Sequence, residues 1–86
     1  MASTETALSL DSLRVLVAEV LEVETYELTD EGDFNEDYDA DSIRAIEILA
    51  RIDMTYGIEI PQEDLPDLKT LSAVHAALLR HAGRSA

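Results

Sequence analysis

The sequence predicts an all-α fold, in which three main helices and one short helix form a small bundle with a long loop after the first helix. Apolar residues recur at the helical period in three segments, and no segment shows the alternation typical of a strand. The chain has 86 residues, 47% of them hydrophobic, and no cysteine. We therefore expect a single domain over residues 1–86, with flexible ends at about residues 1–7 and 83–86.

The first helix is predicted at about residues 8–23. Either Ser9 or Asp11 is a suitable N-cap, because both side chains accept hydrogen bonds from the first free N–H groups of a helix. The spacing of the apolar residues places them on one helix face, which we expect to be buried. These residues are Leu10, Leu13, Val17, Val20 and Leu21.

The acidic stretch 24–40 is predicted to be the long loop. It contains Gly32 and has no sustained helical or strand period. Leu28 and Phe34 are apolar side chains that we expect to anchor it in the core. Loops of this length in a compact domain are usually functional or disordered, so the stretch is a candidate for carrying function.

The second helix is predicted to begin near Asp41–Ser42 and to stop at Gly57, which suits a helix C-terminus. Its predicted apolar stripe is flanked by Ile43 and Ile48. The stripe itself consists of Ile46, Leu49, Ile52 and Tyr56.

The remainder of the chain is predicted to hold one short and one long helix. Residues 58–61 form an extended piece that ends at a proline, and residues 62–68 allow one short helical turn limited by Pro66. Thr70 is expected to cap the last helix, which frays near Gly83. The apolar stripe of this helix is Leu71, Val74, Ala77 and Leu78.

The chain is strongly acidic, with 19 Asp and Glu residues against 6 Lys and Arg, which gives a formal net charge of −13. This charge disfavours binding to nucleic acids and to anionic membranes and favours partners with basic patches. No apolar run approaches the roughly 20 residues that span a bilayer, and the first residues lack the basic start and apolar run of a secretory signal. We therefore expect a cytoplasmic protein.

The acidic loop invites comparison with a calcium-binding EF-hand loop, which needs glycine at position 6 and glutamate at position 12. Two registers, starting at Asp33 and at Asp37, supply oxygen ligands at positions 1, 3 and 5. Both registers lack the glycine and the final acid, so we expect no dedicated metal site.

No catalytic constellation is recognisable in the sequence. A serine nucleophile requires a base within hydrogen-bond reach, oriented by a third group. The only histidines, His75 and His81, lie on the last predicted helix, and no spacing connects them to Ser42. The chain is therefore not expected to be an enzyme.

Ser42 has two interpretations on local grounds. Asp and Ser are both preferred helix N-caps, so the Asp41–Ser42 pair before an apolar-periodic run is explained by capping alone. The alternative is that the Ser42 hydroxyl is a chemical handle. The choice depends on the residues around it.

The stretch "DADSIRAIEILARIDMTYGIEIP" resembles the core of acyl carrier proteins. That family has a Gly-x-Asp-Ser-Leu motif at the start of its second helix, and here the motif reads Asp39-Ala40-Asp41-Ser42-Ile43. The segment Ile46–Ile48 is similar to the family's Val-Glu-Leu, Tyr56 stands where an aromatic closes the helix, and "IEIP" matches the usual next segment. The resemblance covers about residues 8–80.

The resemblance implies that a phosphopantetheinyl transferase attaches 4′-phosphopantetheine, taken from coenzyme A with the help of Mg²⁺, to Ser42. It also implies that the arm's thiol carries acyl groups for polyketide or fatty-acid biosynthesis. Asp41, the neighbour in the motif, would contact the transferase or its metal. The implied partners include an acyltransferase or ketosynthase, and the carrier itself is expected to be a monomer.

Two residues depart from the family motif, and both bear on partner choice. Asp39 replaces the glycine, which suggests a less permissive backbone there, and Ile43 replaces the leucine. Helix two presents a candidate partner-binding face that is less uniformly acidic than usual, which favours a natural-product pathway. With Asp39, this face comprises Arg44, Glu47, Arg51 and Met54. A solvated face with Arg44–Glu47 and Glu47–Arg51 pairs is the simpler interpretation.

Two alternatives to an acyl carrier remain at this point. The first is a carrier of aminoacyl, peptidyl or D-alanyl groups with the same attachment chemistry. The second is an acidic protein-interaction module in which Ser42 is only a helix cap. A route for cargo between the helices, past Ile46, Ile48, Leu49, Ile58 or Leu68, is possible, but we expect most of these side chains to be plain core.

Overall fold

The computed structural model describes residues 8–85, and the side chains of residues 8–82. Within that range the chain is helical and has no strand, which confirms the predicted fold class. The elements in chain order are α2 (Leu10–Leu21), the 3₁₀ turn η1 (Thr25–Glu27), α3 (Phe34–Tyr38), α4 (Ser42–Tyr56), the 3₁₀ helix η2 (Gln62–Asp67) and α5 (Leu71–Ser85). The expectation of flexible ends falls mainly on residues outside this description.

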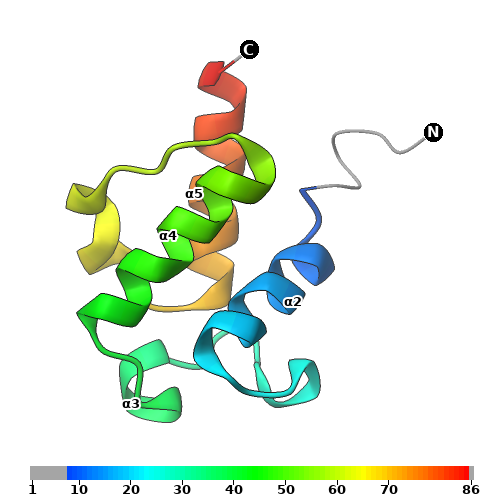
Figure 1. Ribbon diagram of the computed structural model, residues 1–86, viewed down its shortest axis with the longest axis vertical. Coiled ribbons are helices and arrows are strands. Elements are labelled where there is room, and N and C mark those ends of the chain that lie inside the picture. Colours follow the sequence, from blue (N-terminus) through cyan, green and yellow to red (C-terminus); the bar gives the residue numbers. More distant parts are fainter. Residues whose placement is uncertain (1–7, 86) are drawn as a thin grey trace.

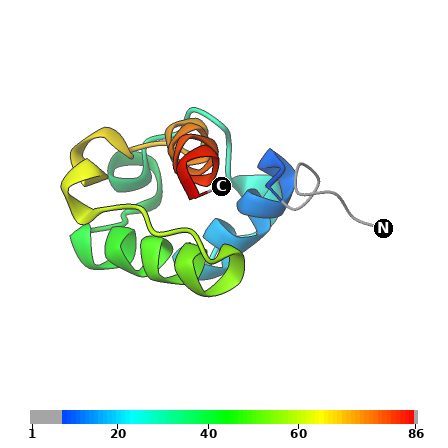
Figure 2. The ribbon, with the colours of Figure 1, turned by 90° about the horizontal axis from the view of Figure 1, so that it is seen from above.

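The three long helices pack around one apolar core (Figure 1). Helix α2 contacts both α4 and α5, and η2 contacts α4. Figure 2 views α5 nearly along its axis, with α2 and α4 beside it. The largest fully buried side chains come from all three helices and the loop: Leu13, Val17, Val20, Leu28, Ile48, Ile52, Leu71, Val74 and Leu78.

Helix α2 begins after Ser9, whose side chain accepts a hydrogen bond from the Ser12 N–H at 3.1 Å. Of the two predicted caps, Ser9 is therefore the one used. The helix ends at Leu21, two residues before the predicted end, because Glu22 adopts a left-handed conformation with φ of 59°.

The predicted loop is more structured than its sequence indicated. Leu28 and Phe34 are buried as expected, but the segment also contains η1 and the five-residue helix α3. Asp33 caps α3 by accepting hydrogen bonds from the N–H groups of Asn35 and Glu36, each at 2.9 Å. A helix of five residues is too short to show an apolar period, which is why the pattern did not predict it.

Tyr38 at the end of α3 connects the two ends of the loop by hydrogen bonds. Its hydroxyl donates to the carbonyl of Glu27 at 3.0 Å and accepts from the N–H of Thr29 at 2.8 Å. Gly32 lies against this contact, where a Cβ atom would be 2.7 Å from the Thr29 hydroxyl and 2.8 Å from that of Tyr38. Glycine at position 32 is therefore required by a close approach.

Two backbone hydrogen bonds join the loop to the start of α5. The N–H of Phe34 donates to the carbonyl of Lys69 at 2.8 Å, and the N–H of Ser72 donates to the carbonyl of Asp30 at 3.0 Å. The guanidinium of Arg14 holds the loop from the other side, through the carbonyl of Leu28 and the carboxylate of Asp30. The loop is thus fixed between α2 and α5.

Helix α4 buries a face slightly different from the predicted one. Ile48, Leu49 and Ile52 are buried and Tyr56 is half-buried, whereas Ile46 is 38% exposed. The buried and half-buried positions 45, 48, 49, 52 and 56 also have helical spacing, and Ile46 lies at the edge of this column. Gly57 ends the helix with φ of 67°, as predicted.

The C-terminal elements follow the prediction closely. Residues 62–67 form η2, and the Thr70 hydroxyl accepts from the Ala73 N–H at 3.1 Å at the start of α5. The predicted stripe of α5 is buried. The helix is assigned as far as Ser85, two residues past Gly83, near which it was expected to fray.

Candidate functional site

Ser42 is the first residue of α4, and its side chain is exposed. The N-cap is Asp41, whose carboxylate oxygen Oδ1 accepts from the N–H of Arg44 at 3.0 Å. Within the described residues the Ser42 hydroxyl has no hydrogen-bond partner. The interpretation of Ser42 as the helix cap is therefore wrong, because Asp41 performs that role.

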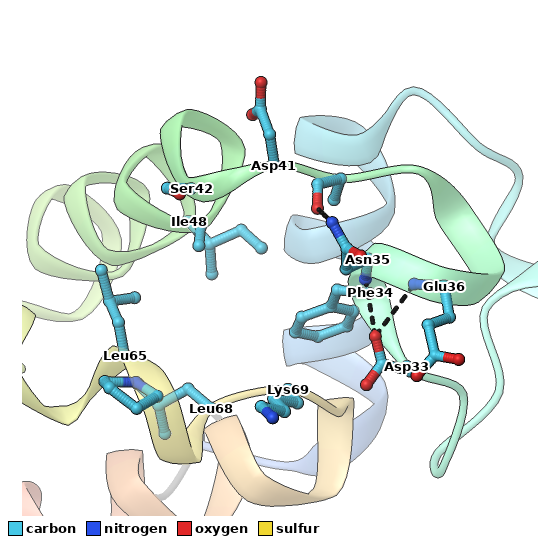
Figure 3. Close-up of a pocket in the computed structure, with 13 residues that line it drawn as sticks. Asp33, Phe34, Asn35, Glu36, Asp41, Ser42, Ile48, Leu65, Leu68 and Lys69 are labelled. Carbon is cyan, nitrogen blue, oxygen red and sulfur yellow. Dashed lines mark hydrogen bonds between the residues drawn. The ribbon is translucent and has the colours of Figure 1, made fainter.

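The backbone before Ser42 turns sharply at Asp39, which has φ of 59° and ψ of 27°. This is the left-handed conformation that glycine adopts most easily, so Asp39 holds a backbone conformation that its Cβ makes less favourable than it would be for glycine. The turn is held by two hydrogen bonds. The N–H of Ala40 donates to the carbonyl of Phe34 at 2.9 Å, and the side-chain amide of Asn35 donates to the carbonyl of Ala40 at 3.1 Å (Figure 3).

A pocket of about 470 Å³ opens beside Ser42. Its walls are α3, the first turns of α4, η2 and the connection to α5 (Figure 3). Of the side chains considered for a cargo route, Ile48 and Leu68 line this pocket, while Leu49 and Ile58 are core residues. Ile46 is partly exposed and lines a separate, smaller depression.

Arg44 points back from α4 onto the C-terminal end of α2. Its guanidinium donates to the carbonyl of Val20 at 2.8 Å and to the carboxylate of Glu22 at 2.7 Å, and it lies 3.7 Å from the carboxylate of Glu47. The hydrogen bond and the charge of Glu22 hold the pKa of Arg44 above its usual value. Arg44 therefore caps the end of α2 as well as facing solvent.

Arg51 makes a second bridge between the same helices, to the carboxylate of Glu19 at 2.7 Å. The expected Arg51–Glu47 pair is therefore not the one formed. The other predicted partner residues, Asp39, Glu47 and Met54, are exposed. Ile43 and Met54 are 72% and 82% exposed, so the outer face of α4 combines apolar side chains with acids.

The two histidines lie away from Ser42. A ring nitrogen of His75 is 2.8 Å from the carbonyl of Leu8, and one of His81 is 3.1 Å from the carboxylate of Asp64. His81 thus contacts η2. Neither histidine lines the pocket beside Ser42.

Among the described residues, acidic and histidine side chains nowhere gather in groups of three or more that would hold a metal ion. None of the helices in the described part of the chain has the length and apolarity needed to cross a membrane.

Sequence reasoning missed three residues that shape this site: Asn35, Tyr38 and Lys69. Asn35 supports the turn before Ser42, Tyr38 fastens the loop, and Lys69 lines the pocket. Only the short helix carrying Asn35 and Tyr38 had a sequence signal, namely an acid at 33 followed three residues later by Glu36.

Comparison with known proteins gives this geometry a context. The family model described as a phosphopantetheine attachment site matches residues 11–78. The polyketide-8 synthase acyl carrier protein 2 of Streptomyces avermitilis is 38% identical over 81 residues, which cover 94% of this chain and 93% of the relative. The meromycolate extension acyl carrier protein of Mycolicibacterium smegmatis is 37% identical over 76 residues, which cover 88% of this chain and 76% of the relative.

A third relative, the acyl carrier protein of Thermosynechococcus vestitus, is 34% identical over 65 residues, which cover 76% of this chain and 80% of the relative. The matches extend across the helices and the segment that contains Ser42, rather than across one short motif. The chain therefore belongs to the phosphopantetheine-attachment family of carrier proteins.

Proposed function

We propose that this chain is an acyl carrier protein for polyketide or fatty-acid-type biosynthesis, with Ser42 as the residue that takes 4′-phosphopantetheine. The observation that carries the proposal is the state of the Ser42 hydroxyl, which is exposed at the start of α4 and has no structural duty among the described residues. The family and its relatives support the cofactor and the carrier role.

The residues around Ser42 fit this group. The start of α4 offers backbone N–H groups and the positive end of a helix dipole, both of which favour a phosphate. The adjoining pocket has room beside the attachment point. When bound, the group supplies the thiol that this cysteine-free chain lacks, so that an acyl group can be held as a thioester.

The side chains near Ser42 then have separable roles. Ser42 Oγ would attack the phosphorus that bears the pantetheine arm of coenzyme A on a phosphopantetheinyl transferase. The pyrophosphate bond breaks, adenosine 3′,5′-bisphosphate leaves, and the serine proton passes to the transferase. Asp41 fixes the first turn of α4 through the Arg44 N–H, while its exposed carboxylate is available to the transferase or its Mg²⁺. Asn35 holds the preceding turn and thereby orients both residues. The chain itself presents the cargo, and partner enzymes carry out the chemistry.

The partner-binding face is proposed to lie on the outer side of α4, where Asp39, Glu47 and Met54 are exposed. Exposed Ile43 adds to the apolar part of this face. Arg44 and Arg51 belong to this face as well. Both form ion pairs with residues of the α2 segment, yet their side chains remain 40% and 38% exposed. An acyltransferase or ketosynthase with an apolar depression ringed by basic side chains would fit this face.

Two finer points complete the proposal. We propose that the carrier has no catalytic activity of its own. In support, the two histidines contact Leu8 and Asp64, and neither lines the pocket beside Ser42. We also propose that it acts as a monomer in the cytoplasm, where coenzyme A and the biosynthetic partners are found. A carrier of aminoacyl groups would share the attachment chemistry, and loading with malonyl against amino-acid donors separates the two.

Intact mass after incubation with coenzyme A, Mg²⁺ and a broad-specificity phosphopantetheinyl transferase tests the proposal. We expect one phosphopantetheinyl increment that is absent in Ser42→Ala and present in the control Ser12→Ala, whose serine is also exposed. No increment with several transferases, or an increment that survives in Ser42→Ala, would refute the assignment.

A further inference from the structure

The pocket beside Ser42 has an apolar interior. Side chains from α3, α4 and the η2 segment surround it, namely Phe34, Ile48, Leu65 and Leu68 (Figure 3). All of these except Leu65 are buried core residues. Because Ser42 lines the same space, the arm proposed for its hydroxyl begins at the pocket. A group at the end of this flexible arm therefore reaches the interior when the arm folds back.

The charged residues that line this pocket are mainly acids. They are Asp33, Glu36, Asp41 and Lys69. Three carboxylates against one ammonium leave an excess of two negative charges. The chain as a whole has a net charge of −13, so the field of the rest of the molecule has the same sign. The apolar interior is thus bounded by a lining of net negative charge.

Glu36 is the acid of this lining that has no structural duty. The carboxylates of Asp33 and Asp41 cap α3 and α4. Glu36 takes part in the cap of α3 only through its backbone N–H, and its carboxylate makes no hydrogen bond or ion pair with any residue of the described part. The charge of Glu36 can therefore be changed without removing a helix cap.

The interior and its lining treat neutral and anionic groups differently. A neutral acyl group gains free energy by removing its apolar surface from water. A carboxylate of the same size loses its hydration there, which is costly for a charged group, and is also repelled by the acids of the lining. The exposed ammonium of Lys69 is outnumbered by these acids, so it does not reverse the balance.

We propose that this pocket takes up neutral acyl groups and excludes carboxylated groups of the same size, with Glu36 as a specificity-determining residue. The inference rests on the proposed function, because it requires an arm at Ser42. The charge of the cargo then decides where the cargo resides. A carboxylated group stays in solvent, where a partner enzyme reaches it, whereas a neutral group is shielded against the apolar interior.

The contribution of Glu36 is expected to be modest, because its side chain is exposed and exposed charges are screened. Removing its charge should raise the ratio of pocket-bound to free carboxylated cargo by about 1.5- to five-fold, the range that single exposed charge pairs give. High salt should act in the same direction on the wild type, since it screens the repulsion and leaves the apolar contact in place.

The test compares malonyl, which has one carboxylate, with acetoacetyl, which has the same number of heavy atoms and no charge. Each is joined to Ser42 with its arm from the coenzyme A ester and verified by intact mass. Both cargoes have a methylene group between two carbonyl carbons. With that group ¹³C-labelled, isotope-filtered NOEs to the side chains of Phe34, Ile48 and Leu68 measure the pocket-bound fraction.

Two variants change the charge of the lining in steps. Glu36→Gln removes one of the two excess negative charges, and Glu36→Lys leaves equal numbers of acids and cations. Glu63→Gln is the matched control, because Glu63 is also an exposed acid in the first turn of a short helix but does not line the pocket. A salt titration of the wild type tests the same repulsion without any substitution.

We expect stronger pocket NOEs with acetoacetyl than with malonyl in the wild type and in Glu63→Gln, a smaller difference in Glu36→Gln and the smallest in Glu36→Lys. Malonyl NOEs that equal or exceed those of acetoacetyl in the wild type would overturn the inference and leave the carrier function intact. The same holds for a difference that neither Glu36 variant nor salt reduces, or that Glu63→Gln reduces equally. Failure to load any cargo at Ser42 would instead overturn the proposed function, and this inference with it.

Discussion

The guanidinium of Arg44 donates to the backbone carbonyl of Val20 at 2.8 Å, which joins the first turn of α4 to the last turn of α2. The contact spans 24 residues of sequence and lies two residues from Ser42. The carboxylate of Glu22 completes it at 2.7 Å. A residue that the sequence assigned to partner recognition therefore also holds two helices together.

Charge reversal at Arg44 is accordingly predicted to affect the fold as well as docking. Arg44→Glu leaves the α2 carbonyl without its donor and places a third acid near Glu22 and Glu47, so the melting temperature should fall. Arg44→Lys should recover part of the loss, because a lysine retains the charge but not the forked contact. Thermal melts followed by circular dichroism measure this. Equal melting temperatures for wild type and Arg44→Glu would contradict the bridge.

Asp39→Gly is predicted to stabilise the protein by about 0.5–1 kcal/mol, because Asp39 has φ of 59°, where side chains with a Cβ are strained. Denaturant unfolding gives the free energy. Asp39→Asn is the control, since it removes the charge and keeps a side chain that tolerates this conformation. If Asn stabilises as much as Gly, relief of charge repulsion rather than of backbone strain is the cause.

Tyr38→Phe is predicted to lower the free energy of unfolding by about 1–2 kcal/mol, because the hydroxyl makes hydrogen bonds with Glu27 and Thr29. The N–H of Thr29 should also exchange faster with solvent. Tyr26→Phe provides a matched control, because Tyr26 is 84% exposed and its change should have almost no effect. Similar losses in both variants would mean that the Tyr38 contact is not special.

Tyr56 links stability to alkaline pH. Burial raises the pKa of its phenol above the ordinary value of 10.0, because the charged form is poorly solvated there. The unfolded chain therefore loses this proton more readily than the folded chain, and stability should fall as the pH rises past about 10. Tyr56→Phe should make the stability curve flatter in this range. A wild-type curve as flat as that of the variant would show that Tyr56 does not contribute.

The helical periods and caps were sufficient to predict the three long helices. Apolar residues at helical spacing form the buried stripe Leu71, Val74 and Leu78, and a glycine at positive φ ends α4 at Gly57. Both signals depend only on nearby residues, so they can be recognised from the sequence. Helix α3 could not be predicted this way, because five residues do not complete an apolar period. Its stability comes from Asp33 at one end and from a tertiary bond to Lys69.

For the site, sequence reasoning predicted Ser42 and its motif neighbours but not their support. Whether Asp41 or Ser42 is the cap depends on a one-residue difference in where α4 begins. Sequence patterns place helix ends only to within one or two residues, so they could not separate the two. The roles of Asn35 and Tyr38 arise from specific hydrogen bonds within the loop, and Lys69 meets Phe34 from far along the chain. Composition and spacing give no signal for these contacts.

The two backbone bonds that join the loop to α5 also set an order of events. Phe34 and Ser72 bind partners 35 and 42 residues away along the chain, at Lys69 and Asp30. The loop before Ser42 therefore lacks its two backbone bonds to the start of α5 until the ribosome has released the segment around Lys69–Ser72. A transferase that recognises the loop in its folded form would act only after this point.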